Sequence, residues 1–148
     1  MNLNNEESLL SLEKTISSVN GIYIGSENNK NLFYFSNVVT DSRNVVENSL
    51  FVPLVGEFQN GHIYVDQAIE KGATVIFIDS KEYESNSNKY KELTEECKNF
   101  SVIVVENTLY ALQAIAETYV EQFPNLIKVA ITGSSGKTTT KEICKTIL

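Results

Sequence analysis

Near its carboxyl end the chain reads Val129-Ala130-Ile131-Thr132-Gly133-Ser134-Ser135-Gly136-Lys137-Thr138-Thr139-Thr140. The apolar residues of this stretch predict a buried strand that ends near Thr132, and the residues from Lys137 onward favour a helix that runs to Leu148. A short turn with a glycine at each end connects the two. This order of strand, turn and helix is typical of a phosphate-binding loop, in which backbone N–H groups face an anion.

The residue types in this turn suit a nucleoside triphosphate. Gly133 and Gly136 let the backbone turn tightly and approach phosphate groups without a Cβ in the way. Lys137 can reach the terminal phosphates and is the candidate catalytic residue, and the hydroxyl of Thr138 can bind Mg²⁺. The expected ATP-binding residues are Gly133, Ser134, Ser135, Gly136, Lys137, Thr138 and Thr139.

The spacing of the turn differs from the common phosphate-loop pattern. Ile131 stands where that pattern has a glycine, five residues before the Gly-Lys pair. An ordinary strand-to-helix turn with a chance lysine is the alternative. Two glycines, a lysine and a run of threonines coincide at one predicted junction, so we expect a nucleotide site that uses ATP and Mg²⁺.

Composition limits the classes of protein to which the chain can belong. It has 148 residues, of which 42% are hydrophobic, and a formal net charge of −7. This charge argues against nucleic acid as a partner, because no basic face is available to neutralise a phosphate backbone. No apolar run is long enough to span a membrane and no leader precedes the first helix, so we expect a cytoplasmic monomer. Cys97 and Cys144 are in no metal-like spacing and indicate reduced thiols.

Strand-like and helix-like segments alternate along the chain. We expect helices at residues 5–18, 62–71 and 108–123, a helix or loop at 80–99, and strands at 22–24, 32–39, 50–55, 74–78 and 101–105. A polar turn is expected at residues 27–30, and Pro53 suggests that its strand lies at a sheet edge or that the proline begins it. The alternation predicts an α/β fold with a largely parallel sheet.

The segments group into two predicted domains. Residues 1–106 form a complete first domain, and residues 107–148 begin a second, nucleotide-binding domain. A nucleotide-binding sheet needs more strands than residues 107–148 supply, and a magnesium site adds a carboxylate from a later strand. We therefore expect the chain to be a fragment of a longer protein.

Two further stretches carry polar groups next to predicted strands. Asp41-Ser42-Arg43 offers a carboxylate, a hydroxyl and a guanidinium fork that suits phosphate or a planar ring. By itself the tripeptide indicates a self-capped turn with a solvated arginine. His62 is the only histidine, and taken alone it indicates a polar residue at a helix start.

Together the three stretches resemble the Mur ligases. They occur in the family's order: Asp41-Ser42-Arg43, Leu50-Phe51-Val52-Pro53-Leu54 followed by Gly56-Glu57 and Gly61-His62, and Thr132 to Thr140 followed by Lys141-Glu142. The Ser-Ser pair of the loop and the Lys-Glu pair after it are most similar to the family member that adds D-alanyl-D-alanine. Asn60 is a departure, because the family more often has aspartate before Gly-His.

The resemblance implies an amide ligase of peptidoglycan synthesis with three domains. Its first domain holds the uridine diphosphate (UDP) end of UDP-N-acetylmuramoyl-tripeptide, its central domain binds ATP and its third brings D-alanyl-D-alanine. ATP phosphorylates the peptide carboxylate, and the amine then attacks the acyl phosphate. The residues implied to bind UDP are Asp41, Ser42, Arg43, Gly61 and His62, with Asp41 holding the turn.

Three other functions stay open at this point. The chain could belong to the ligase that adds the third residue of the muramoyl peptide, to a folylpolyglutamate-type ligase, or to a non-catalytic module that binds a nucleotide sugar. If the chain is part of the ligase that adds D-alanyl-D-alanine, we expect the 148-residue chain alone to bind the UDP moiety and to be inactive. Phosphoryl transfer also needs a second magnesium ligand, an adenine surface and a positioned amine.

Overall fold

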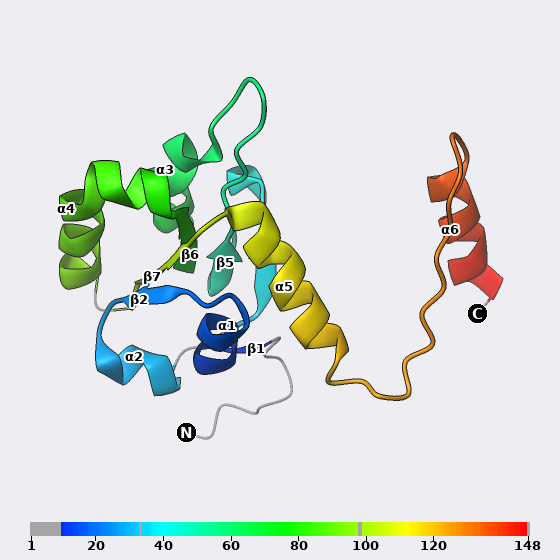
Figure 1. The fold of residues 1–148 in the computed structure, drawn as a ribbon, viewed down its shortest axis with the longest axis horizontal. Helices are drawn as coiled ribbons and strands as arrows, with labels where there is room; N and C mark the ends of the chain where they lie inside the picture. Colours follow the sequence, from blue (N-terminus) through cyan, green and yellow to red (C-terminus); the bar gives the residue numbers. More distant parts are fainter. Residues whose placement is uncertain (1–9, 33, 98, 148) are drawn as a thin grey trace.

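The computed structural model describes residues 10–32, 34–97 and 99–147, and it has the predicted α/β architecture. Figure 1 shows a central sheet with helices on both sides and, apart from this body, a helix near the carboxyl end. The strands are β1 (Leu10–Ser11), β2 (Ile22–Ile24), β3 (Tyr34–Phe35), β4 (Asn37–Val39), β5 (Ser49–Phe51), β6 (Ala73–Asp79) and β7 (Ser101–Val105). The α-helices are α1 (Leu12–Ser18), α2 (Glu27–Leu32), α3 (Val65–Glu70), α4 (Ser80–Glu96), α5 (Thr108–Val120) and α6 (Lys137–Ile147), and two short 3₁₀ helices are η1 (Ser42–Asn44) and η2 (Gly61–Tyr64).

The main sheet has five strands in the order β2-β7-β6-β5-β4. β4, β5, β6 and β7 run parallel to their neighbours, whereas β2 pairs antiparallel with β7. β1 and β3 form a separate antiparallel pair. Because four strands are parallel, their carboxyl ends all meet at one edge of the sheet, which is where ligands bind in open α/β folds.

Both faces of the sheet are buried, which explains the continuous apolar runs at residues 75–78 of β6 and 102–105 of β7. Val75 and Phe77 of β6 contact the cluster that includes Ala111 and Ile115 of α5. The alternate residues of the strand, Ile76 and Ile78, contact the cluster on the other face, which includes α3 and α4. The chain therefore has three layers, with helices on each side of one sheet.

The central strands and the long helices confirm the sequence predictions. The strands predicted at residues 22–24, 74–78 and 101–105 are β2, β6 and β7, and the helix predicted at 108–123 is α5, which ends at Val120. The polar segment from residue 80 is the helix α4. The segment predicted as one helix at 62–71 is η2 followed by α3, and Gly72 follows the C-cap residue with a φ of 102°.

Other element predictions were wrong in the amino-terminal third. The helix predicted at residues 5–18 begins only at Leu12, because Ser11 caps it by accepting the Lys14 N–H at 3.2 Å. Residues 5–9 lie outside the described residues. Residues 27–30 form part of α2 instead of a turn, and the segment at 32–39 holds the end of α2 and the two short strands β3 and β4.

The strand predicted at residues 50–55 is shorter, and its proline has a different role. β5 ends at Phe51 and lies inside the sheet between β6 and β4, so Pro53 marks neither an edge strand nor a strand start. Proline cannot donate to a ladder, so the chain leaves the sheet before Pro53. Its carbonyl accepts the hydroxyl of Thr108 at 2.6 Å.

The strand predicted before the phosphate loop is absent from the described residues. Residues 125–132 are in no helix or strand, and most of their side chains are exposed, Ile127 to 86%. A strand needs a neighbour to receive its hydrogen bonds. The turn and the helix that were predicted after it are present, because α6 begins at Lys137. Among the described helices, none combines the length and the apolarity that crossing a membrane requires.

Candidate functional site

The Asp41-Ser42-Arg43 segment leaves β4 and forms a turn that its own side chains close. Asp41 Oδ1 accepts the backbone N–H of Arg43 at 2.9 Å, which caps the start of η1. The same carboxylate binds the Arg43 guanidinium, with Nε 3.0 Å from both carboxylate oxygens and Nη2 2.6 Å from Oδ2. This paired geometry fixes the plane of the guanidinium, although 81% of the Arg43 side chain is exposed.

The pairing shifts the pKa of both groups. Hydrogen bonds from the Arg43 side chain lower the pKa of Asp41 to about 2. The hydrogen bond from Arg43 to Asp41 in turn raises the pKa of Arg43. Both groups are therefore charged at neutral pH. Because the pair is open to solvent, it adds little to the stability of the fold, and its main effect is to hold a cation at the sheet edge.

The turn is anchored to α3 by two hydrogen bonds. Ser42 is buried, and its Oγ donates to Gln67 Oε1 at 2.6 Å. Lys71 Nζ donates to the carbonyl oxygen of Arg43 at 3.0 Å. The serine of the motif therefore fixes the turn against the next helix along the chain.

The segment that follows β5 forms the second wall of the site. Gly61 donates its N–H to the Leu54 carbonyl at 2.9 Å, and a Cβ at Gly61 would lie 2.7 Å from that oxygen. Only glycine allows the two backbone segments to approach so closely. Gly56 donates to the Gln59 carbonyl at 2.9 Å, and Gln59 Nε2 donates to the Tyr64 hydroxyl. These bonds hold the loop at residues 55–60 against η2.

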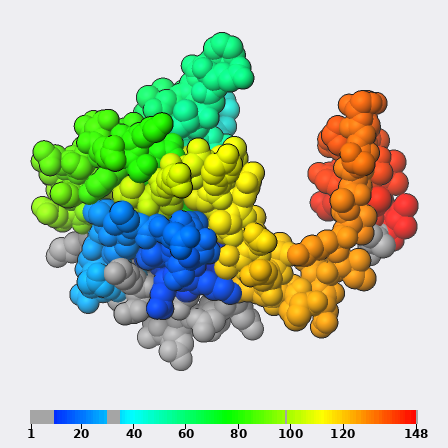
Figure 2. All heavy atoms as spheres, viewed as in Figure 1, coloured from blue at the N-terminus to red at the C-terminus, as the bar shows by residue number. Residues whose placement is uncertain are grey.

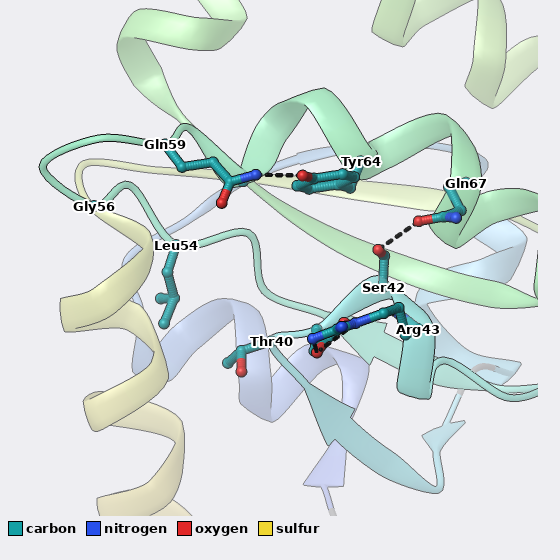
Figure 3. Close-up of a pocket in the computed structure, with 10 residues that line it drawn as sticks. Thr40, Ser42, Arg43, Leu54, Gly56, Gln59, Tyr64 and Gln67 are labelled. Atoms are coloured by element: carbon teal, nitrogen blue, oxygen red, sulfur yellow. Dashed lines mark hydrogen bonds and ion pairs between the residues drawn. The ribbon is translucent and has the colours of Figure 1, made fainter.

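A cavity of about 610 Å³ lies between these two walls, at the carboxyl ends of β4 and β5. Figure 3 shows the turn of Arg43 on one side and Gln59, Tyr64 and Gln67 on the other. The lining residues are Thr40, Asp41, Ser42, Arg43, Leu54, Gly56, Gln59, Gly61, Tyr64 and Gln67. Four of the five residues expected at a UDP site, all except His62, therefore border one cavity.

His62 makes its contacts within the chain instead of in this cavity. The ring is buried, Nδ1 lies 2.7 Å from Asn60 Oδ1, and Nε2 accepts the Asp79 backbone N–H at 3.1 Å. Both bonds are made by neutral imidazole with its proton on Nδ1. Burial lowers the pKa of His62, against a smaller opposite effect of Asp79. His62 borders a separate cavity of about 430 Å³, whose lining also includes Asp79, Glu82 and Glu106.

Asn60 explains why aspartate is not needed before Gly-His in this chain. Its Oδ1 accepts both the backbone N–H of His62 at 3.0 Å and, at 2.7 Å, the ring Nδ1–H. An amide oxygen meets these two donors as a carboxylate would, but without a charge. Asn60 thus caps η2 and selects the His62 tautomer.

The start of α5 is joined to the ends of β5 and β6 by two hydrogen bonds of Thr108. Thr108 donates its backbone N–H to Asp79 Oδ1 at 2.8 Å and its hydroxyl to the Pro53 carbonyl at 2.6 Å. Pro53 is followed directly by Leu54 in the cavity wall. The helix that leads toward the phosphate loop therefore begins beside the cavity.

The predicted phosphate loop lies apart from the cavity. Figures 1 and 2 show α6 and the segment before it separated from the body of the protein. Gly136 has a φ of 76°, in the left-handed region that favours glycine, and no atom lies within 4 Å of where its Cβ would be. Lys137 Nζ donates to the Gly133 carbonyl, across the turn. The structure therefore does not bring the two groups of predicted site residues together.

The loop residues fit a phosphate group. Thr140 donates its N–H to the Gly136 carbonyl at 2.9 Å, which leaves the N–H groups of Lys137, Thr138 and Thr139 without a helical acceptor. The open space at Gly136 admits a ligand close to the backbone. In the part of the chain that the structure describes, no cluster of three or more His, Cys, Asp or Glu side chains could hold a metal ion.

Tyr64, Gln67 and Gln59 line the cavity but were not predicted from the sequence. Two of these residues, Tyr64 and Gln67, lie in the predicted helix at residues 62–71, and the position of that helix could have indicated their place at the cavity. The helix follows the strand next to Asp41, and its Tyr64 and Gln67 line the same cavity. The distance in sequence between residues 43 and 64 hid this relation.

Comparison with known proteins agrees with this arrangement. Residues 34–120 match the family model described as Mur ligase family, catalytic domain. The chain belongs to the Mur ligase family. The matched segment of this Mur ligase chain contains every residue that lines the cavity and ends before the phosphate loop.

Relatives and solved structures of Mur ligases cover different shares of the chain. It is 42% identical over 115 residues to the UDP-N-acetylmuramoyl-tripeptide–D-alanyl-D-alanine ligase of Treponema pallidum, covering 76% of this chain and 24% of the relative. It is 38% identical over 113 residues to the UDP-N-acetylmuramoyl-L-alanyl-D-glutamate–2,6-diaminopimelate ligase of Clostridium tetani, covering 76% and 21%. A crystal structure of MurF from Acinetobacter baumannii matches 93% of this chain and 26% of its own, with a TM-score of 0.66 and 26% identity. The chain thus spans about a quarter of the length of these proteins.

Proposed function

We propose that the chain acts as part of an ATP-dependent ligase that adds D-alanyl-D-alanine to UDP-N-acetylmuramoyl-tripeptide. The cavity beside η1 binds the UDP end of the muramoyl peptide, and the loop at residues 133–138 binds ATP. The observation that carries the proposal is that Asp41, Ser42, Arg43 and Gly61 border one cavity at the carboxyl edge of the sheet. The relative in Treponema pallidum and the MurF structure support the choice of substrate.

The chemistry of the cavity suits a diphosphate. Asp41 holds the Arg43 guanidinium in place but occupies only some of its five N–H donors, so the others can bind a phosphate. Thr40 adds a hydroxyl at the same edge. Two negative phosphates next to this cation gain charge-assisted hydrogen bonds, whose geometry the turn has already set.

The phosphate loop provides the groups that ATP needs. The N–H groups at the start of α6 point along the helix axis toward an anion, and Lys137 adds a mobile positive charge. The hydroxyl of Thr138 would hold Mg²⁺. When bound, ATP supplies the phosphoryl group that activates the peptide carboxylate, and Lys137 stabilises the charge that develops on that group.

Calorimetry with UDP tests the cavity. We expect the 148-residue chain to bind UDP without ATP, and Arg43→Ala to weaken binding by about 1.5–3 kcal/mol, or roughly 10- to 150-fold, through loss of a charge-assisted bond. Lys89→Ala is the matched control. It removes the same charge from an exposed pair with Asp66, 2.8 Å apart, outside the cavity. Equal affinity of Arg43→Ala and the parent would remove Arg43 from the site.

A second candidate is the ligase that adds diaminopimelate, since the relative in Clostridium tetani is 38% identical. The amino substrate separates the two. The ligase that carries this chain should release ADP when UDP-N-acetylmuramoyl-tripeptide and D-alanyl-D-alanine are both present. ADP release with UDP-N-acetylmuramoyl-L-alanyl-D-glutamate and diaminopimelate would decide for the second candidate.

A further inference from the structure

The cavity contains an aromatic side chain to which the proposed function gives no role. Tyr64 ends η2, its side chain is half-buried, and its ring lines the cavity. Its hydroxyl accepts a hydrogen bond from Gln59 Nε2, so the ring is held at its hydroxyl as well as at its attachment to the backbone. Among the described residues that line this cavity, Tyr64 is the one aromatic residue.

The ring and the cation of the cavity occupy different walls. Figure 3 shows the Tyr64 ring across the opening from the Arg43 guanidinium, with Ser42 and Gln67 beside them. The hydrogen bond to Asp41 is the main cause of the raised pKa of Arg43, and Tyr64 is near enough to add a smaller coulombic effect. A ligand in the cavity therefore meets an apolar flat surface on one side and a positive charge on the other.

A nucleoside diphosphate has two parts that match the two walls of the cavity. Its base is planar and uncharged, and its diphosphate is anionic. A base that stacks on an aromatic side chain gains free energy whatever its hydrogen-bonding edge, because every base has a π face. The guanidinium, in contrast, acts on the phosphates. The remaining lining side chains, which are aliphatic, hydroxyl, amide or carboxylate groups, offer no comparable flat surface for the base.

We propose that the Tyr64 ring is the surface on which the base of the UDP moiety stacks. Tyr64 thereby sets the affinity for the base, while Arg43 sets the affinity for the diphosphate. The inference rests on the proposed function, because it assigns a part of the same ligand to a further residue.

A purely structural role for the ring is the competing explanation. Tyr64 also packs against the hydrophobic cluster that includes Val65, Ala68 and Ile78. In that case its removal would loosen the whole cavity wall and weaken every ligand equally. A ligand without a base separates the two explanations.

The experiment compares UDP with inorganic pyrophosphate on the same variants. Tyr64→Leu should weaken UDP binding by about 5- to 150-fold and leave pyrophosphate binding unchanged. Tyr64→Phe keeps the ring and should remain within about threefold of the parent for both ligands. Arg43→Ala should weaken both. Calorimetry measures the UDP affinities, and phosphorus NMR follows pyrophosphate in the millimolar range.

A spectroscopic readout tests the inference first on the parent chain. In the proton NMR spectrum of UDP, the uracil H5 and H6 signals should move upfield when the parent chain binds, because they lie over an aromatic ring. The shift should persist with Tyr64→Phe and disappear with Tyr64→Leu at saturating ligand. A shift of the ribose protons in place of H5 and H6 would assign the ring to the sugar and overturn the inference.

Failure of the inference can be told apart from failure of the proposed function. If the parent binds UDP and Arg43→Ala weakens it, but Tyr64→Leu binds UDP as the parent does, Tyr64 has no part in base binding. Equal losses for UDP and pyrophosphate in Tyr64→Leu would show a structural wall and overturn the inference as well. If the parent does not bind UDP, the proposed function fails and the inference fails with it.

Discussion

Gly61 offers a sharp test of how the cavity wall is built. In Gly61→Ala the new Cβ would lie 2.7 Å from the Leu54 oxygen, 2.8 Å from its nitrogen and 3.1 Å from the Pro53 Cα. All three are backbone atoms, so no side-chain rotation relieves the contacts. The wall that carries Leu54 must move away from η2, and the hydrogen bond between Gly61 and Leu54 at 2.9 Å must lengthen.

The expected cost follows from two opposing effects. Forcing an extra carbon into a packed site costs about 1–3 kcal/mol. Replacing glycine with alanine also restricts the unfolded chain, which returns about 0.4–1 kcal/mol. We therefore expect Gly61→Ala to lower the free energy of unfolding by about 0.5–2 kcal/mol, measured by urea denaturation followed by circular dichroism.

Gly56→Ala is the matched control in the same loop. Its Cβ would meet only the Gln59 carbonyl, at 3.6 Å, which is an ordinary contact. The unfolded-state effect is the same, so this variant should keep or slightly exceed the stability of the parent. If the two variants were equally stable, the close approach of Gly61 to Leu54 would not constrain the wall, and the argument above would be refuted.

Three further predictions concern protonation, packing and catalysis. Burial lowers the pKa of His62 below 6.5, so between that lowered value and 6.5 the unfolded chain binds a proton that the folded chain does not. Stability should therefore fall as pH falls below about 6.5, and His62→Gln should flatten this slope in urea titrations at several pH values; an unchanged slope would contradict the neutral ring. Ser42→Ala removes the bond to Gln67 and should lower the free energy of unfolding by about 1 kcal/mol, whereas a neutral result would show that the turn is held without it. The 148-residue chain should release no ADP with both substrates and Mg²⁺, and in the ligase that carries this chain Lys137→Ala should abolish ADP release; release by the 148-residue chain itself would show that the catalytic groups lie within it.

Sequence patterns predicted the helices and strands that are determined by their own apolar pattern. β6 and β7 contain continuous apolar runs at residues 75–78 and 102–105, and α5 has a strong helical period. Prediction was wrong where pairing partners decide the outcome. Residues 129–132 have the composition of a strand, but no described strand lies beside them, and composition alone cannot supply one.

The candidate site was predictable only in part, for a similar reason. Asp41, Arg43 and Gly61 were predicted from the resemblance to the Mur ligases, because by itself the tripeptide indicates only a self-capped turn. Tyr64 and Gln67 join them only because parallel strands place the residues after β4 and β5 at one edge. His62 was expected beside the UDP, but both of its ring nitrogens are used within the chain. Its role in binding UDP stays a prediction.

The two hydrogen bonds of Thr108 have a mechanical consequence. They clamp the first turn of α5 to β6 and to the exit of β5, and Ile115 farther along the helix is held in the core. A helix of 13 residues is about 20 Å long, so α5 forms a rigid arm along one face of the sheet. The residues from 121 to 130 that follow the helix are exposed. Any swing of the phosphate loop toward the cavity therefore pivots beyond Val120, and the start of the arm near Asn107 stays fixed.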